Sequence, residues 1–194
     1  VVAKTSVELT INGADGKRAV RNAETNLGDL CADAYRILLG ADIAFVNGGG
    51  VRDNIKVGDI TYGDIIKVHP FGNEACLVEV TGQQIKDALE LGSAAYPGES
   101  GGFLQVSGLT YTINADIPSS VVKNDKSEFV KVDGAYRVSD IMVGGQPLDV
   151  NKTYTLASHN YMLKDAGDGY TMFGTKNVKL LKLSLIHISE PTRP

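Results

Sequence analysis

The stretch ADIAFVNGGGVRDNI, residues 41–55, carries a short apolar strand directly into three consecutive glycines and then an arginine. The strand predicted over residues 43–46 is followed by Asn47 and by the glycines at 48–50. Glycine adopts positive φ without strain and lets a ligand come close to the backbone. Such a turn can present successive N–H groups to an anion, and Arg52 can add a forked donor for phosphate or carboxylate. By itself, however, the stretch fits an ordinary tight turn with a surface arginine better.

Helix signals surround this turn in the first half of the chain. The spacing of apolar residues predicts a helix over 27–39, with Asn26 as its N-cap and Gly40 as its stop. The residues expected on the buried face of this helix are Leu27, Leu30, Cys31, Ala34 and Leu38. Two capping-box patterns, which start at Thr61 and Thr81, predict two more helices.

Strands dominate the second half, where the hydrophobic period changes to two. Strands are predicted at 103–106, 109–113, 129–132, 137–143 and 153–158, and earlier ones at 7–11 and 75–80. A short helix near 159–165 and a glycine turn over 166–169 follow. These elements predict an α+β fold, with one domain over residues 1–183 and a mixed β-sheet flanked by helices. The last residues, 184–194, have no periodic pattern and are interpreted as a vector-derived tail, with a genuine C-terminal extension as the alternative.

Length, charge and composition limit the class of protein. With 194 residues, of which 43% are hydrophobic, the chain suits one well-buried globular domain. A net charge of −4 argues against a nucleic-acid polymer as partner, and no run of about 18 apolar residues predicts a transmembrane segment. The start at Val1 rather than Met fits a processed protein or a piece of a longer one. Cys31 and Cys76 suit two buried thiols or a disulfide, and their spacing does not decide between these.

Three further residues stand out as candidate binding groups, each with a plainer explanation. Phe71 lies in the loop segment HPFG, where an exposed and a buried ring are equally well explained. Tyr161 and Asp168 lie in NYMLKDAGDGY, where a carboxylate between glycines suits sugar hydroxyls but also an Asx turn. His69 suits a hydrogen-bonded structural role. The sequence has no pattern typical of a two-metal phosphoesterase, which indicates a binding surface with no catalytic residue and no metal ligand.

Six segments together carry a family resemblance. In chain order they are ETNLGDLCADAY, NGGGVRDNI, HPFGNE, TGQQIKDALE, GGFLQVSGLTYTI and AGDGY. Their combination resembles the C-terminal domain of the 5′-nucleotidase family, which includes bacterial UDP-sugar hydrolases and 2′,3′-cyclic-nucleotide phosphodiesterases. The resemblance covers about residues 5–182, which is nearly the whole chain.

The resemblance implies a nucleotide site, position by position. The residues that it places at the phosphate and ribose end are Arg21, Asn47, Gly49, Gly50 and Arg52. It implies that Phe71 is one of two rings that stack on the base, and that Asp168 accepts the ribose hydroxyls. The second ring would be Tyr161, but one extra residue separates it from Asp168, and Met162 has the family spacing. Two rings can stack on any base, which predicts broad base tolerance.

The same resemblance implies the remainder of an enzyme. In such proteins a separate N-terminal metallophosphatase domain holds two divalent metal ions and the catalytic residues, and this chain contains none of it. The chain is therefore expected to bind nucleotides or nucleosides without a cofactor or turnover of its own. It would belong to a phosphoric ester hydrolase at the cell surface, in the periplasm or outside the cell. The alternatives are an interaction or dimerisation module that no longer binds nucleotide, and a related hydrolase domain for other phosphates.

Overall fold

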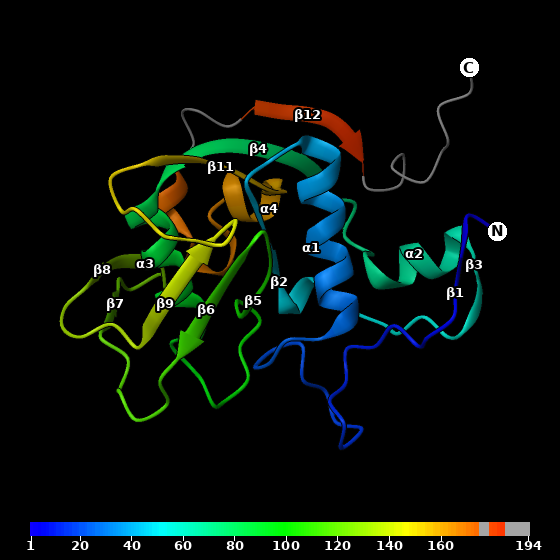
Figure 1. Ribbon diagram of the computed structural model, residues 1–194, viewed down its shortest axis with the longest axis horizontal. Helices are drawn as coiled ribbons and strands as arrows, with labels where there is room; N and C mark the ends of the chain where they lie inside the picture. The colour runs from blue at the N-terminus through cyan, green and yellow to red at the C-terminus, as the bar shows by residue number, and fades with distance from the viewer. Residues whose placement is uncertain (175–178, 185–194) are drawn as a thin grey trace.

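A five-stranded mixed β-sheet forms the centre of the protein (Figure 1). The structure is a computed structural model and describes residues 1–174 and 179–184. In spatial order the strands are β12 (Lys179–Ser184), β4 (Glu74–Thr81), β11 (Thr153–His159), β2 (Ile43–Asn47) and β5 (Leu104–Ser107). β11 and β2 run parallel, with Leu156 opposite Ile43, whereas the other neighbours are antiparallel. The predicted mixed sheet is therefore confirmed.

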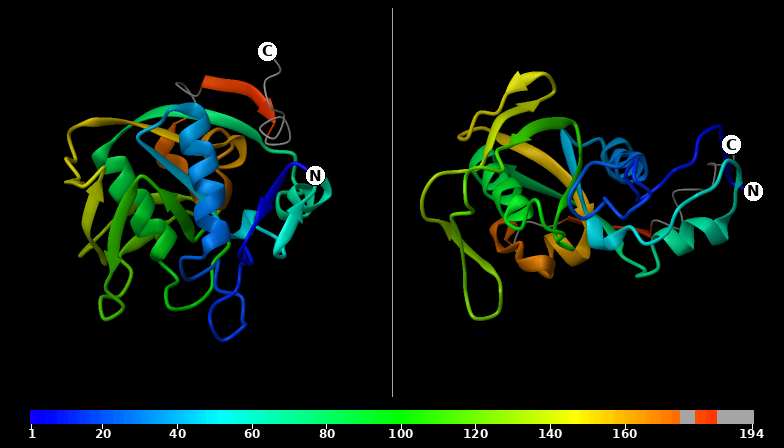
Figure 2. Two further views of the ribbon diagram at one scale, coloured as in Figure 1. Left: turned by 45° about the vertical axis from the view of Figure 1, so that its right-hand side comes forward. Right: turned by 90° about the horizontal axis from the view of Figure 1, so that it is seen from below.

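Both faces of this sheet are buried, as β2 shows most clearly. All five residues of β2 are buried. Because side chains alternate along a strand, Ile43 and Phe45 enter one hydrophobic core, whereas Ala44 and Val46 enter the other. A strand with two covered faces needs a continuous apolar run, which explains the sequence IAFV. Helices and further strands lie on the two sides of the sheet (Figure 2).

Four α-helices in the part of the chain that the structure describes supply much of these two cores. The helices are α1 (Asn26–Leu39) and α2 (Tyr62–Val68) in one core, and α3 (Gly82–Ser93) and α4 (Asn160–Leu163) in the other. α2 and α3 begin with the predicted capping boxes at Thr61 and Thr81, in which side chain and backbone bond in both directions. α1 ends at Gly40, which takes the left-handed conformation with φ 62°. These helix boundaries confirm the local signals.

Two predictions about α1 are wrong. Thr25, not Asn26, is the N-cap, because the Thr25 hydroxyl accepts a hydrogen bond from the Gly28 N–H. The Asn26 side chain instead bonds to the backbone of the N-terminal segment. Leu30 and Leu38 are 45% and 40% exposed rather than buried. The face that packs on β2 and β5 consists of Leu27, Gly28, Cys31, Ala32 and Tyr35.

Within the described residues, the remaining elements form three small sheets and three short turns of 3₁₀-helix. The strands are β1 (Ala3–Thr5) with β3 (Gly58–Ile60), β6 (Leu109–Ile113) with β9 (Val138–Val143) and β10 (Gln146–Pro147), and β7 (Val121–Lys123) with β8 (Phe129–Val132). The 3₁₀ turns are η1 (Gly48–Gly50), η2 (Gly167–Gly169) and η3 (Thr171–Phe173). Figure 1 places β1, β3 and α2 at one end of the molecule and the β7–β8 hairpin at the other.

The N-terminal strand prediction fails, and the tail prediction lies almost wholly outside the described residues. Residues 7–11 do not form a strand, because only Leu9 pairs, in an isolated bridge with Ile55. β1, β3, β7 and β10 are two or three residues long, too short to leave a period-two pattern. From residue 185 onward, the proposed tail is not described.

The two cysteines are free and buried, so a disulfide between them is ruled out and the buried-thiol interpretation is confirmed. They lie in different cores, on opposite faces of the sheet, which separates them. Burial raises the pKa of Cys31 to about 12 and that of Cys76 to about 11, so both stay protonated at neutral pH. No helix in the described part of the chain is both long and apolar enough to cross a membrane.

Candidate functional site

The candidate site lies at one edge of the central sheet. β2 and β11 are parallel, so their carboxyl ends, Asn47 and His159, lie at the same edge. Their antiparallel neighbours start there, since Leu104 of β5 pairs with Asn47 and Ala75 of β4 pairs with His159. Ligands of open α/β sheets bind beyond the carboxyl ends of parallel strands. The loops that follow β2 and β11 and the loops that precede β4 and β5 therefore meet at one place.

A cavity of about 330 Å³, which we call the site cavity, opens between these loops. Its volume lies in the range typical of small-molecule sites. The residues that line it are Arg21, Asn47, Gly49, Gly50, Phe71, Asn73, Gly101, Tyr161 and Asp168. Every site residue named from the sequence lines it except Arg52, which lies beside it. Asn73 and Gly101 were not predicted, although both fall within segments that carry the family resemblance.

Asp168 is the centre of the polar wall. Its Oδ2 accepts a hydrogen bond of 2.7 Å from Asn47 Nδ2, and its Oδ1 accepts one of 3.0 Å from the Tyr161 hydroxyl. Asp168 lies in η2 with φ 55° and ψ 16°, a left-handed conformation that aspartate tolerates better than most residues. Each carboxylate oxygen has more than one acceptor position, so both can accept a further hydroxyl from a ligand.

Two exposed aromatic rings line the cavity. Phe71 is 59% exposed and Tyr161 is 39% exposed, so Phe71 is not a core residue. Met162, the alternative to Tyr161, is completely buried. Because successive helical residues point about 100° apart, α4 presents Tyr161 to the cavity and Met162 to the core. A Cβ on Gly167 would overlap with the Tyr161 ring, so this glycine leaves the room that the ring occupies.

The glycine turn η1 differs from its prediction in two ways. None of its glycines has a positive φ. The Gly48 N–H donates to the Phe103 carbonyl at 2.7 Å and the Gly49 N–H donates to the Gly101 carbonyl at 2.8 Å, so these groups hold the next loop and not an anion. Close packing requires the glycines instead. A Cβ on Gly48 would overlap with the Val20 carbonyl oxygen, and one on Gly49 would lie 3.1 Å from the Gly101 backbone.

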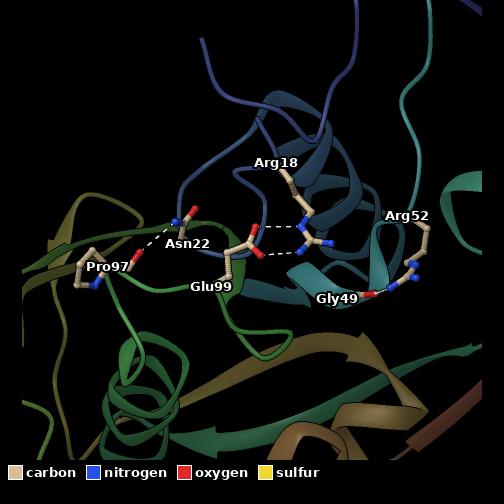
Figure 3. Close-up of polar contacts among 6 residues, drawn as sticks. All are labelled: Arg18, Asn22, Gly49, Arg52, Pro97 and Glu99. Carbon is tan, nitrogen blue, oxygen red and sulfur yellow. Dashed lines mark hydrogen bonds and ion pairs between the residues drawn. The ribbon is translucent and has the colours of Figure 1, made fainter. Parts of the chain in front are cut away.

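Two arginines supply positive charge at the cavity. Arg21 is partly exposed and lines it directly. Arg52 is exposed, and its Nη1 donates to the Gly49 carbonyl at 3.4 Å (Figure 3). The Arg52 guanidinium carbon lies 5.9 Å from the centre of the Phe71 ring, within the range of a cation–π contact. Arg52 therefore joins the glycine turn to one of the two aromatic rings.

Polar contacts fix the loop that carries Gly101 to the segment before α1 (Figure 3). Arg18 donates to Glu99 through two hydrogen bonds of 2.9 and 2.5 Å, and Asn22 Nδ2 donates to the Pro97 carbonyl at 3.0 Å. The hydrogen bond from Arg18 lowers the pKa of Glu99, so the carboxylate stays ionised. These contacts flank Arg21 in sequence and hold its backbone beside the loop.

Two histidines with lowered pKa values lie behind the polar groups. His159 Nε2 lies 3.1 Å from Asn47 Oδ1, and burial lowers the pKa of His159 to about 3. His69 Nε2 lies 3.1 Å from Cys31 Sγ. Burial lowers the pKa of His69 to about 4, although a backbone hydrogen bond with Gly50 acts in the opposite direction and raises it. His69 thus has the structural contacts predicted for it. His159 was not predicted, because only the pairing of β11 with β2 brings it to the site.

The groups at the site cavity offer stacking, hydrogen-bonding and ionic contacts. In the described ranges, 1–174 and 179–184, no group of three or more His, Cys, Asp or Glu side chains is arranged to hold a metal ion. The site cavity offers flat apolar rings, a carboxylate acceptor and the guanidinium donors of Arg21, with Arg52 beside it. Such a set suits a ligand that combines an aromatic ring, hydroxyl groups and negative charge.

Comparison with known proteins now gives the family. The family model described as 5′-nucleotidase, C-terminal domain, matches residues 1–175. The chain belongs to this family. This 5′-nucleotidase C-terminal domain is 36% identical, over 182 residues, to the trifunctional nucleotide phosphoesterase protein YfkN of Bacillus subtilis. It is 37% identical, over 156 residues, to the 5′-nucleotidase of Vibrio cholerae. The two alignments cover 89% and 79% of the chain.

A solved structure shares the fold of the domain. The crystal structure of a 5′-nucleotidase precursor from Thermus thermophilus matches 97% of the chain with a TM-score of 0.80 and 32% identity. The 5′-nucleotidase C-terminal domain spans only part of these relatives, namely 11% of YfkN, 24% of the Vibrio cholerae protein and 35% of the Thermus thermophilus chain. Most of each relative therefore lies outside the region that this domain matches.

Proposed function

We propose that this chain is the substrate-binding domain of a metal-dependent 5′-nucleotidase-type hydrolase, and that its site cavity binds the base and ribose of nucleotides. One observation carries the proposal. Two exposed aromatic rings, a carboxylate and an arginine that lie far apart in the sequence line one cavity of about 330 Å³. These residues are Arg21, Phe71, Tyr161 and Asp168.

Each part of a nucleotide has a partner of matching chemistry in this proposal. The base stacks on Phe71 and Tyr161, and each stack contributes about 1–3 kcal/mol regardless of base identity. Asp168 accepts hydrogen bonds from the ribose hydroxyls. Arg21 and Arg52 bind the phosphate through their forked donors. Because the N–H groups of Gly48 and Gly49 already bond within the protein, phosphate recognition falls to the arginines.

Hydrolysis belongs, in this proposal, to a metallophosphatase domain of the same parent protein, which holds the divalent metal ions. The greater length of the relatives supports this division. The parent protein would act at the cell surface, in the periplasm or outside the cell. The chain by itself is expected to bind nucleosides and nucleotides without turnover.

Calorimetry with adenosine and AMP tests the site. We expect Phe71→Ala to weaken the binding of both ligands by about 5- to 100-fold, the loss of one base stack. Val57→Ala is a matched control, because Val57 is a similarly exposed apolar residue, at 62%, and does not line the cavity. Binding of adenosine by Phe71→Ala as tight as by the wild type contradicts the stacking role. Metal-dependent phosphatase turnover by the chain alone contradicts the division of labour.

A further inference from the structure

His159 makes none of the proposed ligand contacts, yet it touches the group that holds Asp168. We infer that His159 is a positioning residue, which fixes the carboxylate of Asp168 for the ribose hydroxyls by orienting the Asn47 amide that lies between them. The inference rests on the proposed function, because it concerns the preparation of the proposed ribose acceptor.

The hydrogen bonds along these three side chains run in one direction. Asp168 Oδ2 accepts, so the atom of Asn47 that faces it at 2.7 Å is the amide nitrogen. The carbonyl oxygen of Asn47 therefore faces His159 Nε2 at 3.1 Å. Because a carbonyl oxygen only accepts, Nε2 must carry the proton. His159 thus donates to Asn47, and Asn47 donates to Asp168.

The surroundings of His159 keep its ring neutral and in place. The residue is 2% exposed, and burial, with repulsion from His69, holds its pKa far below the neutral range. Its Nδ1 is buried and has no hydrogen-bond partner in the described part of the chain, and the smaller effect of its own backbone, which raises the pKa, does not offset burial. The ring centres of Tyr35 and Tyr161 each lie 6.0 Å from that of His159. The proton therefore stays on Nε2.

Removal of the His159 donor would change the orientation of the Asp168 carboxylate and not only the packing of the core. Asn47 is 5% exposed, so its carbonyl oxygen would be left buried without a partner. Rotation of the amide would instead turn that oxygen toward the Asp168 carboxylate, and two acceptors would face each other. A Cβ on Gly50 would lie 2.7 Å from Asn47 Oδ1, which shows how closely the backbone encloses this amide. Either response removes the fixed orientation of the carboxylate.

The test compares two ligands on each of four proteins by calorimetry. Adenosine has both ribose hydroxyls, whereas 2′,3′-dideoxyadenosine has neither and keeps the base. The proteins are the wild type, His159→Leu, His159→Gln and Asp168→Asn. His159→Leu removes the donor, and the amide of His159→Gln can donate from a position near that of Nε2. Asp168→Asn shows the effect of altering the acceptor itself.

We expect the wild type to prefer adenosine, and His159→Leu to reduce this preference by about tenfold, as Asp168→Asn does, with little change for the dideoxy ligand. His159→Gln should keep most of the preference. The ratio of the two affinities does not depend on the folded fraction, so partial unfolding does not obscure it. Equal loss of both ligands in His159→Leu, or no loss, overturns the inference while the proposed function stands. Failure of the wild type to bind adenosine overturns the proposed function and the inference with it.

Discussion

Two cavities of nearly equal size differ in almost every property that matters for ligand recognition. The site cavity measures about 330 Å³, and a second one, which we call the α1–α2 groove, measures about 320 Å³. The groove is lined by Val2, Ala3, Leu27, Leu30, Cys31, Ala34, Ile55, Ile60, Ile65, Val68 and His69. Nearly all of these side chains are aliphatic, so the groove offers apolar contact and few hydrogen bonds.

The difference lies in how the two cavities are built. The faces of two amphipathic helices and two short segments form the groove, and such faces are apolar because they pack against a core. Loops at the ends of sheet strands form the site cavity, and loops can carry polar groups without loss of core packing. Volume alone therefore does not mark a functional site, whereas the convergence of polar groups from separate loops does.

The largest expected effect concerns Gly48, in the glycine turn η1 beside the site cavity. We expect Gly48→Ala to lower the free energy of unfolding by about 3 kcal/mol or more, because its Cβ would overlap with the Val20 carbonyl oxygen. The control on the groove side is Gly63→Ala in α2, whose Cβ would meet only Thr61 Oγ1 at 3.6 Å. This control should be neutral or more stable by about 0.5–1 kcal/mol. Urea unfolding of both variants tests this, and equal midpoints would show that packing does not require Gly48.

The next effect uses one histidine at each cavity, His159 behind Asn47 of the site cavity and His69 in the lining of the α1–α2 groove. Unfolded histidine titrates near pH 6.5, whereas burial lowers the pKa of His159 to about 3 and of His69 to about 4. Between pH 5.5 and 4.5 the unfolded chain therefore binds about two protons that the folded chain does not. Stability must fall as the pH falls, by up to about 2.7 kcal/mol per pH unit. Asp29 opposes this loss, because burial and Glu24 raise its pKa to about 6 and it binds a proton when folded.

Single substitutions separate the two histidines. His69→Gln and His159→Gln should each reduce the slope of unfolding free energy against pH by about 1.4 kcal/mol per unit, which is the contribution of one proton. Asp29→Asn should make the slope steeper, because it removes the opposing proton. Urea unfolding at pH 5.5, 5.0 and 4.5 measures these slopes. A slope that neither histidine variant changes would place the acid sensitivity elsewhere in the protein.

The smallest expected effect distinguishes the groove from the site. Leu30 lines the α1–α2 groove and is 45% exposed, so Leu30→Ser should cost less than about 1 kcal/mol of stability. It should change the dissociation constant for adenosine by less than about twofold, because Leu30 does not line the site cavity. Leu27→Ser, at a position 1% exposed on the same helix, should cost about 3 kcal/mol or more. Weaker adenosine binding by Leu30→Ser would mean that the two cavities are coupled.

Local rules predicted those parts of the fold that depend on a few adjacent residues. The capping boxes at Thr61 and Thr81 each satisfy their backbone groups within four residues, so the pattern is complete in the sequence. Such rules predicted the buried face of α1 less well. Leu30 and Leu38 are as apolar as Leu27, and only the position of β2 and β5 decides which leucine is covered.

By itself, the sequence determined the family, the capping boxes of α2 and α3 and the glycine stop of α1, and it predicted eight candidate site residues, because motifs and these caps are properties of neighbouring residues. Only the tertiary structure decided that Tyr161 rather than Met162 reaches the cavity, that two glycine N–H groups are already bonded, and that His159 lies behind Asn47. Each of these depends on which distant segment is the neighbour. The parallel pairing of β2 with β11 sets that neighbour, and pairing between strands more than 100 residues apart leaves no local pattern.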